Sequence, residues 1–270
     1  MRIIITGSAG TIGRVLVRGL TTRYEIVGVD SEYYGARLGK DDEQCIALNL
    51  VHEAVRFKTL VAETEPDAII HLAWNIREGG GGLPGRLDYA TWDAHEMNER
   101  MVRTVLMATT THKVPRLILA SSVHAAIGHL GGYEYPASIR EKDRHGAFHR
   151  KTKIRVSDGP AASGLYGATK VWMEEAARAA AAEAGGALTA IAVRFGNVRP
   201  DDNAAQSEYP FYLSHRDCVQ FIERCLSAKN LRSFSTFFTV SDNACNPFNI
   251  SDAERTLGYK PQDGTSCPFR

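Results

Sequence analysis

The stretch from Thr6 to Gly13, which reads TGSAGTIG, decides the fold of this protein. It follows a short apolar run, Ile3 to Ile5, and leads into an amphipathic segment that extends to Leu20. An apolar run of this kind is typical of a buried strand, and the closely spaced glycines allow the chain to turn tightly into a helix. The stretch therefore predicts the first strand–turn–helix unit of a parallel sheet.

The same alternation continues along the chain. Further strands are predicted at Glu25–Val29, Ala68–Leu72, Arg116–Ala120 and Leu188–Arg194. Helical stretches are predicted at Thr91–Thr111, Ser163–Ala184 and His215–Ala228, and a short helix is expected to begin with a capping box at Ser251. Strands that alternate with helices predict an α/β fold, here a Rossmann-type, doubly wound parallel sheet.

The composition is typical of a soluble globular protein, with 270 residues, 44% of them hydrophobic and 23% charged. The formal net charge of +1 provides no electrostatic basis for binding nucleic acid or an anionic membrane. No signal peptide and no apolar run long enough to span a bilayer is visible. The cysteines form no Cys-x-x-Cys pair, and the histidines lack partners at metal-ligand spacing, so we expect a cytoplasmic protein without a metal site.

The glycine stretch also predicts a dinucleotide site. Its glycines let the backbone approach a pyrophosphate, and the N-terminus of the following helix offers free N–H groups and a positive dipole end. Asp30 ends the next predicted strand, where an acid accepts hydrogen bonds from the adenosine ribose hydroxyls. Because a carboxylate there would repel a 2′-phosphate, NAD is favoured over NADP, although Arg14 and Arg37 could weaken this preference.

A second motif, Tyr166-Gly167-Ala168-Thr169-Lys170, stands at the start of the predicted Ala-rich helix. Its spacing places the phenol and the ammonium one turn apart on one helical face, and a nearby cation stabilises the phenolate that can act as a base. Alone, such a pair is usually exposed and without function. Here, however, Ser121 and Ser122 end the preceding strand, where side chains of an open sheet face the ligand crevice.

Together with His71-Leu72-Ala73, these motifs make the chain similar to the extended short-chain dehydrogenases/reductases of the NAD-dependent epimerase/dehydratase superfamily. Within that superfamily the chain resembles the uronate dehydrogenases. The resemblance covers nearly the whole chain, and the narrower likeness rests on these stretches: Ala120–His124, Gly164–Gly167, Val193–Gly196, Leu213–Asp217 and Leu257–Pro261.

The resemblance implies that Ser122 polarises a substrate hydroxyl, that Tyr166 is the general base, and that Lys170 holds the nicotinamide ribose and tunes Tyr166. It implies a larger set of residues that bind or organise the NAD site: Gly7, Gly10, Thr11, Ile12, Gly13, Asp30, Asn49, Leu50, Leu72, Ala73, Trp74, Asn98, Ser121, Tyr166, Lys170, Phe195 and Asn197. A smaller set is expected at the substrate: Asn75, Ser122, Val123, His124 and Asn197.

The chain departs from this family mainly on the substrate side. The family grips the hexuronate carboxylate with an arginine just before the Leu-Ser-His stretch, but no arginine lies between Arg199 and Arg216. Val123 stands where the family has asparagine, and Asn75-Ile76 stands where it has a serine. Asn49 replaces an acid that contacts adenine, which we expect to have a small effect. We therefore expect a substrate other than a plain hexuronate bound in the family's manner.

The resemblance also implies one domain over residues 1–270. Residues 1–200 would form mainly the NAD-binding core, and residues 201–270 a small substrate-binding lobe. The inserted residues 131–159, rich in lysine and arginine, are interpreted either as a solvated surface loop or as a lid over the site. The two long predicted helices could form the dimer face that is common in this superfamily.

The expected activity is NAD-dependent oxidation of a carbohydrate hydroxyl, on a uronate-like or aldose-like small molecule, with Tyr166 as the base. One alternative is a nucleotide-sugar epimerase or dehydratase that retains its NAD. A second alternative, of a different class, is a non-catalytic protein that senses NAD or binds a partner, since a fold does not by itself imply a function.

Overall fold

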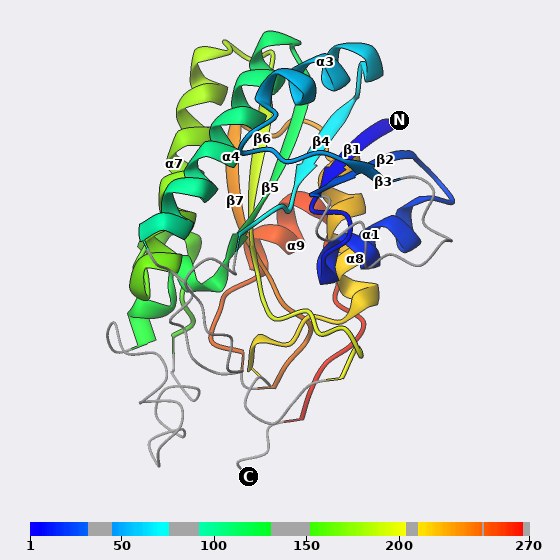
Figure 1. Ribbon diagram of the computed structural model, residues 1–270. Helices are drawn as coiled ribbons and strands as arrows, with labels where there is room; N and C mark the ends of the chain where they lie inside the picture. The colour runs from blue at the N-terminus through cyan, green and yellow to red at the C-terminus, as the bar shows by residue number, and fades with distance from the viewer. Residues whose placement is uncertain (32–44, 76–91, 131–151, 204–209, 245, 267–270) are drawn as a thin grey trace.

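The computed structural model describes residues 1–31, 45–75, 92–130, 152–203, 210–244 and 246–266 (Figure 1). At its centre, the described strands form a seven-stranded sheet in the order β3-β2-β1-β4-β5-β6-β7, and every neighbouring pair is parallel. The strands have these bounds: β1 (Arg2–Thr6), β2 (Glu25–Asp30), β3 (Cys45–Ala47), β4 (Ala68–His71), β5 (Arg116–Ser122), β6 (Thr189–Phe195) and β7 (Phe234–Thr239). Since the strand order reverses between β1 and β4, the predicted doubly wound Rossmann-type fold is confirmed.

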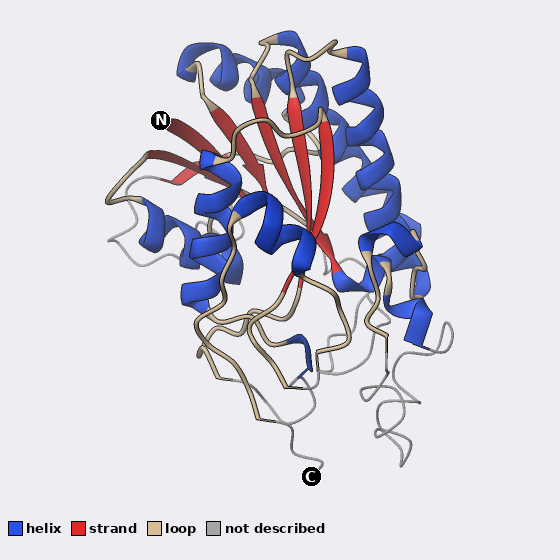
Figure 2. Ribbon diagram, turned by 180° about the vertical axis from the view of Figure 1, so that it is seen from behind, coloured by secondary structure: helices blue, strands red, loops and turns tan. Residues whose placement is uncertain are grey.

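Helices cover both faces of this sheet, as the two opposite views show (Figures 1 and 2). One face is covered by α3 (Ala54–Thr64), α4 (Trp92–Thr111) and α7 (Gly164–Glu183), and the other by α1 (Thr11–Leu20), α8 (His215–Ser227) and α9 (Ser251–Leu257). Three short 3-10 helices lie near the ends of β5 and α7: η1 (Val123–Ala125), η2 (Ile127–Leu130) and η3 (Val156–Asp158). None of the described helices has the length and apolar character that crossing a membrane requires.

The first strand explains why both layers are needed. Ile3, Ile4 and Ile5 are all 0% exposed. Because successive side chains of a strand point to opposite faces, Ile3 and Ile5 pack with residues of α1, α8 and α9, while Ile4 packs with α3, α4 and α7. A strand that is apolar on both faces is typical of a parallel sheet between two helical layers.

The structure adds elements that the sequence analysis does not predict, namely β3, α3 and β7. β3 has only three residues, too few for a recognisable pattern, and β7 reads FSTFFT, in which the buried residues are consecutive. The capping box predicted at Ser251 is wrong. Ser251 is itself the first helical residue of α9, so its hydroxyl cannot cap the helix; instead the Asn249 side chain accepts a hydrogen bond from the Ser251 N–H at 2.9 Å.

The part of the chain after residue 200 shares the Rossmann layers. β7 pairs with β6 at the edge of the sheet, and residues of α8 and α9 belong to the same apolar cluster as Ile3 and Ile5. Some residues of the expected substrate-binding lobe, 201–270, therefore belong to the sheet and to its apolar core. Residues 131–151 of the predicted insertion lie outside the described residues, as does Arg37.

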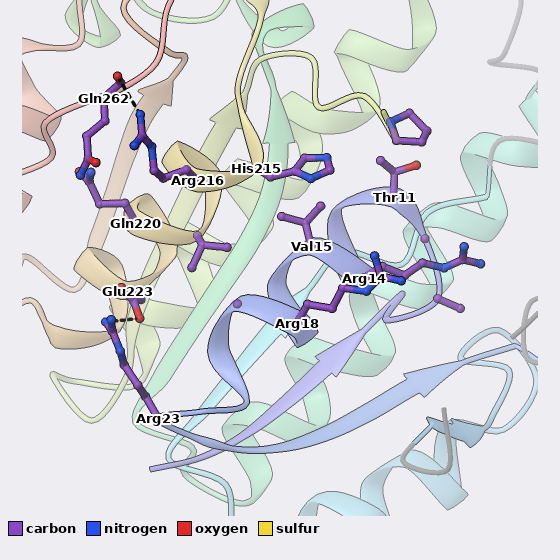
Figure 3. A pocket seen from close by; sticks show the side chains of 15 residues that line it. Thr11, Arg14, Val15, Arg18, Arg23, His215, Arg216, Gln220, Glu223 and Gln262 are labelled. Atoms are coloured by element: carbon purple, nitrogen blue, oxygen red, sulfur yellow. Dashed lines mark hydrogen bonds and ion pairs between the residues drawn. The ribbon is translucent and has the colours of Figure 1, made fainter. Parts of the chain in front are cut away.

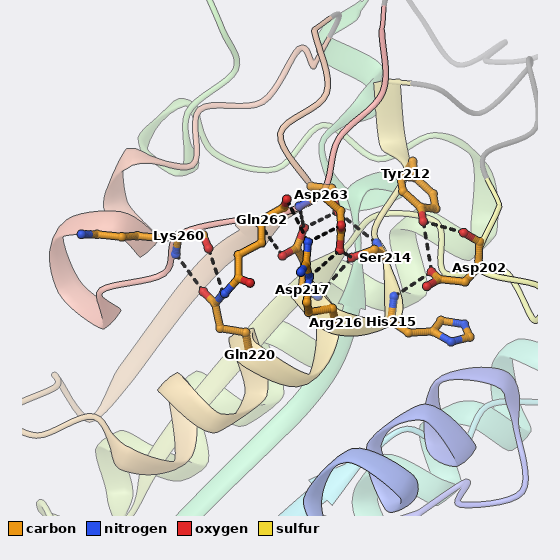
Figure 4. Close-up of polar contacts among 11 residues, drawn as sticks. Asp202, Tyr212, Ser214, His215, Arg216, Asp217, Gln220, Lys260, Gln262 and Asp263 are labelled. Atoms are coloured by element: carbon orange, nitrogen blue, oxygen red, sulfur yellow. Dashed lines mark hydrogen bonds and ion pairs between the residues drawn. The ribbon is translucent and has the colours of Figure 1, made fainter.

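A buried carboxylate, Asp217, fastens the C-terminal segment to these layers (Figure 4). It lies in the first turn of α8 and accepts hydrogen bonds from Ser241 Oγ (2.6 Å) and from the N–H groups of Gln262 (2.7 Å) and Asp263 (3.1 Å). Ser214 caps the same helix by accepting a hydrogen bond from the Asp217 N–H at 3.1 Å. The beginning of α8, the chain just after β7 and the last described residues are therefore held together by one side chain.

Replacing Asp217 with alanine should lower the free energy of unfolding by about 3 kcal/mol, because one buried and two partly buried donors would lose their charged acceptor. Urea denaturation followed by circular dichroism measures this change. Asp252→Ala is the matched control, since Asp252 pairs with exposed Arg255 and should contribute about 0.5 kcal/mol or less. Similar losses for the two variants would contradict the assignment of Asp217 as the fastening residue.

Candidate active site

The glycine turn between β1 and α1 is shaped for close approach of another backbone. Gly7 has φ +73°, and a Cβ there would lie 2.5 Å from the backbone nitrogen of Ala73, at the end of β4. A Cβ on Gly13 would overlap the carbonyl oxygen of Gly7. Gly10 is the N-cap of α1 and provides no side-chain cap, so the first N–H groups of the helix remain available to an anion. These features fit the pyrophosphate of a dinucleotide.

Asp30 lies beside this turn, at the end of β2. Its carboxylate accepts hydrogen bonds from the N–H groups of Ala9 (2.9 Å) and Ser31 (2.8 Å). Burial raises the pKa of Asp30, while these two hydrogen bonds and the charge of Arg14 act in the opposite direction. The predicted ribose acceptor is thus brought next to the predicted phosphate turn.

The ends of β3 and β4 carry further residues expected at the cofactor. Asn98, 3% exposed on α4, accepts a hydrogen bond from the Asn75 N–H (2.7 Å) and donates one to the Asn75 carbonyl (3.1 Å), which holds the segment after β4 in place. Asn49 Oδ1 already accepts a hydrogen bond from the Val51 N–H at 2.9 Å, and Leu50 is buried in the core. Asn49 therefore orders the start of α3 as well as lying at the predicted adenine end.

The serine and tyrosine that are predicted to react, Ser122 and Tyr166, come together because η1 packs against the start of α7. Ser122 ends β5, and its Oγ accepts a hydrogen bond from the His124 N–H at 3.2 Å. The His124 carbonyl accepts one from the Ser163 N–H (3.0 Å), and its ring Nδ1 lies 2.8 Å from Ser163 Oγ. The His124 ring then meets the Tyr166 ring edge to face, with centroids 5.4 Å apart. Ser122, His124 and Tyr166 thus gather at one edge of the sheet.

Lys170 is buried beside this group and is only 3% exposed. Its Nζ donates a hydrogen bond to the Ala120 carbonyl (2.6 Å) and lies 3.3 Å from the ring centroid of Trp74 and 5.6 Å from that of Tyr166. Burial lowers the pKa of Lys170 well below its usual value, and the carboxylate of Glu174 partly opposes this effect. This distance to the Tyr166 ring is compatible with the predicted role of Lys170 in stabilising a phenolate of Tyr166.

Ser121 points away from this group. Its hydroxyl donates a hydrogen bond to Glu174 (2.5 Å), which forms two further bonds with the guanidinium of Arg194 (2.9 and 2.8 Å) in the interior. The structure therefore places Ser121 in a buried polar cluster rather than among the reactive side chains. Sequence reasoning missed this cluster, although Glu174 stands one helical turn after Lys170 and on the same face of α7.

The other predicted substrate residues are only partly brought together. Val123 is 4% exposed and packs in an apolar cluster with Phe211 and Phe248, so its side chain faces the interior rather than the site. Phe195 is also buried, at the end of β6. Asn197 is held by its backbone, which donates a hydrogen bond to the Phe211 carbonyl at 2.6 Å.

A hollow of about 780 Å³ lies between α1 and α8 and opens beside the glycine turn (Figure 3). Its lining includes Arg14 and Arg18 from α1 and Arg216 from α8, together with residues 9–11 of the turn. It contains none of the three reactive side chains described above. Its mouth therefore borders the cofactor turn, away from the reactive group. Among the described residues, no cluster of three or more histidine, cysteine or acidic side chains is placed to hold a metal ion.

Comparisons with known proteins agree with this geometry. Residues 3–234 match the family described as the NAD dependent epimerase/dehydratase family. The chain is 25% identical to the uncharacterized protein YtbQ of Bacillus subtilis (strain 168), over 98% of this chain and 95% of that protein. It is 24% identical to an L-arabinose 1-dehydrogenase (NAD(P)(+)) of Haloferax volcanii, over 98% of each.

Among solved structures, the chain is similar to a mutant uronate dehydrogenase from Agrobacterium tumefaciens in complex with NAD, with a TM-score of 0.70 and 24% identity. The match covers 98% of this chain and 85% of that one. At this level of identity the likeness concerns the fold, and it agrees with the strand order found here.

Replacing Asp30 with serine should weaken NAD binding about tenfold and strengthen NADP binding by a similar factor, because the ribose acceptor is lost and the repulsion of a 2′-phosphate next to Arg14 disappears. Isothermal titration calorimetry with each dinucleotide measures both changes. Asp67→Ser is the control, since Asp67 binds the Arg2 N–H at the opposite end of the sheet. An unchanged ratio of the two affinities in Asp30→Ser would contradict the role of Asp30.

Two buried histidines should make the fold sensitive to acid. Burial lowers the pKa of His71 to about 3 and that of His124 to about 4, whereas an unfolded histidine titrates near 6.5. As the pH falls below about 6.5, the unfolded chain takes up protons that the folded chain excludes, so stability decreases. We expect a loss of about 2 kcal/mol per histidine between pH 7 and pH 5.

Urea denaturation at the two pH values tests this expectation. The variant His124→Gln should lose about 2 kcal/mol less than the wild type over the same interval. His52→Gln, which changes an exposed histidine, should retain the full wild-type loss. Identical losses in the wild type and His124→Gln would show that His124 does not contribute.

Proposed function

The chain belongs to the NAD dependent epimerase/dehydratase family, and from this premise we propose that it oxidises a carbohydrate hydroxyl by hydride transfer to NAD. Membership confirms the predicted cofactor and the predicted class of NAD-dependent enzyme. The observation that carries the proposal is the grouping of Ser122, Tyr166 and Lys170 at the edge of the sheet where the glycine turn ends β1. In this proposal Tyr166 is the base, Ser122 supplies a hydroxyl and Lys170 supplies a cation, and their grouping supports these roles.

The residues of the chain have complementary roles in this proposal. Ser122 donates a hydrogen bond to the substrate oxygen and orients it. Tyr166, as phenolate, takes the hydroxyl proton, while the C–H bond of the same carbon breaks and a carbonyl forms. Lys170 contributes the positive charge that stabilises the phenolate. NAD, when bound, supplies the acceptor for the hydride.

The substrate class is proposed from the relatives and from what this chain lacks. The similarity to a uronate dehydrogenase and to an L-arabinose 1-dehydrogenase supports a carbohydrate substrate, and in a pyranose the anomeric carbon would be oxidised to a lactone. A plain hexuronate held in the family's manner is disfavoured. Arg199 is paired with Asp201 (3.0 Å) and Arg216 with Asp263, so the arginines on both sides of the gap already hold carboxylates of the chain itself.

The proposal also covers the role of the C-terminal residues and the oligomeric state. We propose that residues 201–270 provide the substrate side of the site, and that the chain forms a homodimer or a higher homo-oligomer. The proposed position of the substrate near Asn197 is compatible with the backbone bonds that connect this residue to the segment before α8.

Replacing Tyr166 with phenylalanine should reduce turnover about 10³-fold, because the general base is removed, while the affinity for NAD should change little. NADH production is followed with a panel of aldoses, uronates and nucleotide sugars, and NAD binding is measured by calorimetry. Tyr24→Phe is the matched control, because it makes the same chemical change beyond the far end of α1 and should retain full activity.

Full turnover in Tyr166→Phe would exclude the proposed mechanism. Tightly retained NAD, with no NADH formed from any free sugar but conversion of a nucleotide sugar, would instead identify an epimerase or dehydratase. NAD binding with no turnover on any member of the panel, together with NAD-dependent binding of another protein, would favour the non-catalytic alternative.

A further inference from the structure

Trp74, in the segment just after β4, has a contact that the proposed reaction does not require. The Nζ atom of Lys170 lies 3.3 Å from the centroid of the Trp74 ring. The same indole meets the Tyr166 ring edge to face, with centroids 6.0 Å apart and an interplanar angle of 89°. One aromatic side chain therefore touches both members of the Tyr166–Lys170 pair.

The other contacts of the ammonium show why this position matters. Lys170 is nearly fully buried, and its Nζ donates a hydrogen bond to the Ala120 carbonyl at 2.6 Å. Among the residues that the structure describes, no carboxylate forms an ion pair with it. Glu174 lies one turn further along α7, but its two oxygens are already bound by Arg194 and Ser121. The ammonium is thus held by one carbonyl and by the face of Trp74, and the ring of Tyr166 lies farther away, at 5.6 Å.

An indole has the strongest attraction for a cation among the aromatic side chains, and the attraction increases when the pair is removed from water. A buried ammonium without an ion-pair partner is unstable and tends to lose its proton. The face of Trp74 therefore supplies favourable electrostatic energy where a carboxylate would otherwise be needed. A carboxylate here would also repel the phenolate that Tyr166 must form.

We propose that Trp74 is a positioning residue that holds the ammonium of Lys170 charged and in place between the Ala120 carbonyl and the ring of Tyr166. This inference rests on the proposed role of Tyr166 as the base. Through Lys170, Trp74 makes the phenolate of Tyr166 accessible at lower pH than the lysine alone would achieve.

Other charged or titratable groups face this pair from the elements around it. Glu174 lies on α7 itself, Arg194 on β6, His71 on β4 and His124 on η1. Both histidines have a pKa lowered by burial, to about 3 and about 4, so they are neutral above pH 5. The Glu174–Arg194 pair cancels its own charge. None of these groups replaces the contact between Trp74 and Lys170.

The experiment measures the ionisation of Tyr166 directly and needs no substrate. The near-ultraviolet absorbance of tyrosinate is titrated in the wild type and in Tyr166→Phe, and the difference gives the midpoint for Tyr166. The same difference is measured in Trp74→Phe and Trp74→Leu, each paired with its Tyr166→Phe double variant. Phenylalanine retains a weaker aromatic face, whereas leucine fills space without one. Comparing the two variants therefore distinguishes an electrostatic effect of Trp74 from an effect of packing.

We expect the midpoint to rise by about one pH unit in Trp74→Leu and by less in Trp74→Phe. In a Lys170→Met background, Trp74→Leu should leave the midpoint unchanged, because the interaction that it removes is already absent. Trp92→Leu is the matched control, since Trp92 is 74% exposed and should shift nothing. Circular dichroism confirms that each variant is folded.

Equal midpoints for tryptophan, phenylalanine and leucine at position 74 would overturn the proposal and reduce Trp74 to a packing residue. A shift that persists in Lys170→Met would also overturn it, because the effect would then not pass through the ammonium. These outcomes are independent of the substrate panel. A failure of the proposed reaction is therefore distinguishable from a failure of this inference.

Discussion

The burial of β1 on both faces constrains the rest of the structure. Three adjacent isoleucines with no exposed surface require one helical layer on each side of the sheet, and those layers come from distant parts of the chain. Parallel pairing of β1 with both β2 and β4 then brings the carboxyl ends of these strands to one edge. The glycine turn, Asp30 and the segment after β4 meet there because of this pairing. In open parallel sheets, the point where the strand order reverses is where ligands bind.

In the proposed reaction, the chemistry at that edge depends on the buried ammonium of Lys170. Lys170 comes from α7, its carbonyl partner Ala120 from β5, and its aromatic partner Trp74 from the segment after β4. Burial works against the charged form of Lys170, and each partner compensates for part of that effect. Behind this group, Glu174 accepts hydrogen bonds from Ser121 and Arg194, which ties α7 to β5 and β6. These buried polar groups thus connect the helix that carries Lys170 to two strands of the sheet.

The cofactor side of the candidate site agrees with the family, whereas the substrate side departs from it. The glycine turn and Asp30 satisfy geometric demands that many members of an NAD-dependent family share, and the family match accords with them. On the substrate side, Val123 faces the core, and Arg199 and Arg216 are occupied by Asp201 and Asp263. These contacts support the proposal that a substrate is recognised by groups other than the expected hexuronate-binding residues.

The sequence alone predicted the features that depend on local order. The apolar run, the glycine spacing and the following acid gave the fold and the cofactor, because each is a property of neighbouring residues. The spacing of Tyr166 and Lys170 on one helical face was equally visible.

Contacts between distant segments could be decided only by the tertiary structure. It showed that Ser121 turns toward Glu174 while its neighbour Ser122 faces the site, since adjacent residues of a strand point to opposite faces. It also placed β7 in the sheet through pairing with β6, and Trp74 over a lysine 96 positions further along the chain. Such contacts follow from how the layers pack, and no pattern within either segment encodes them.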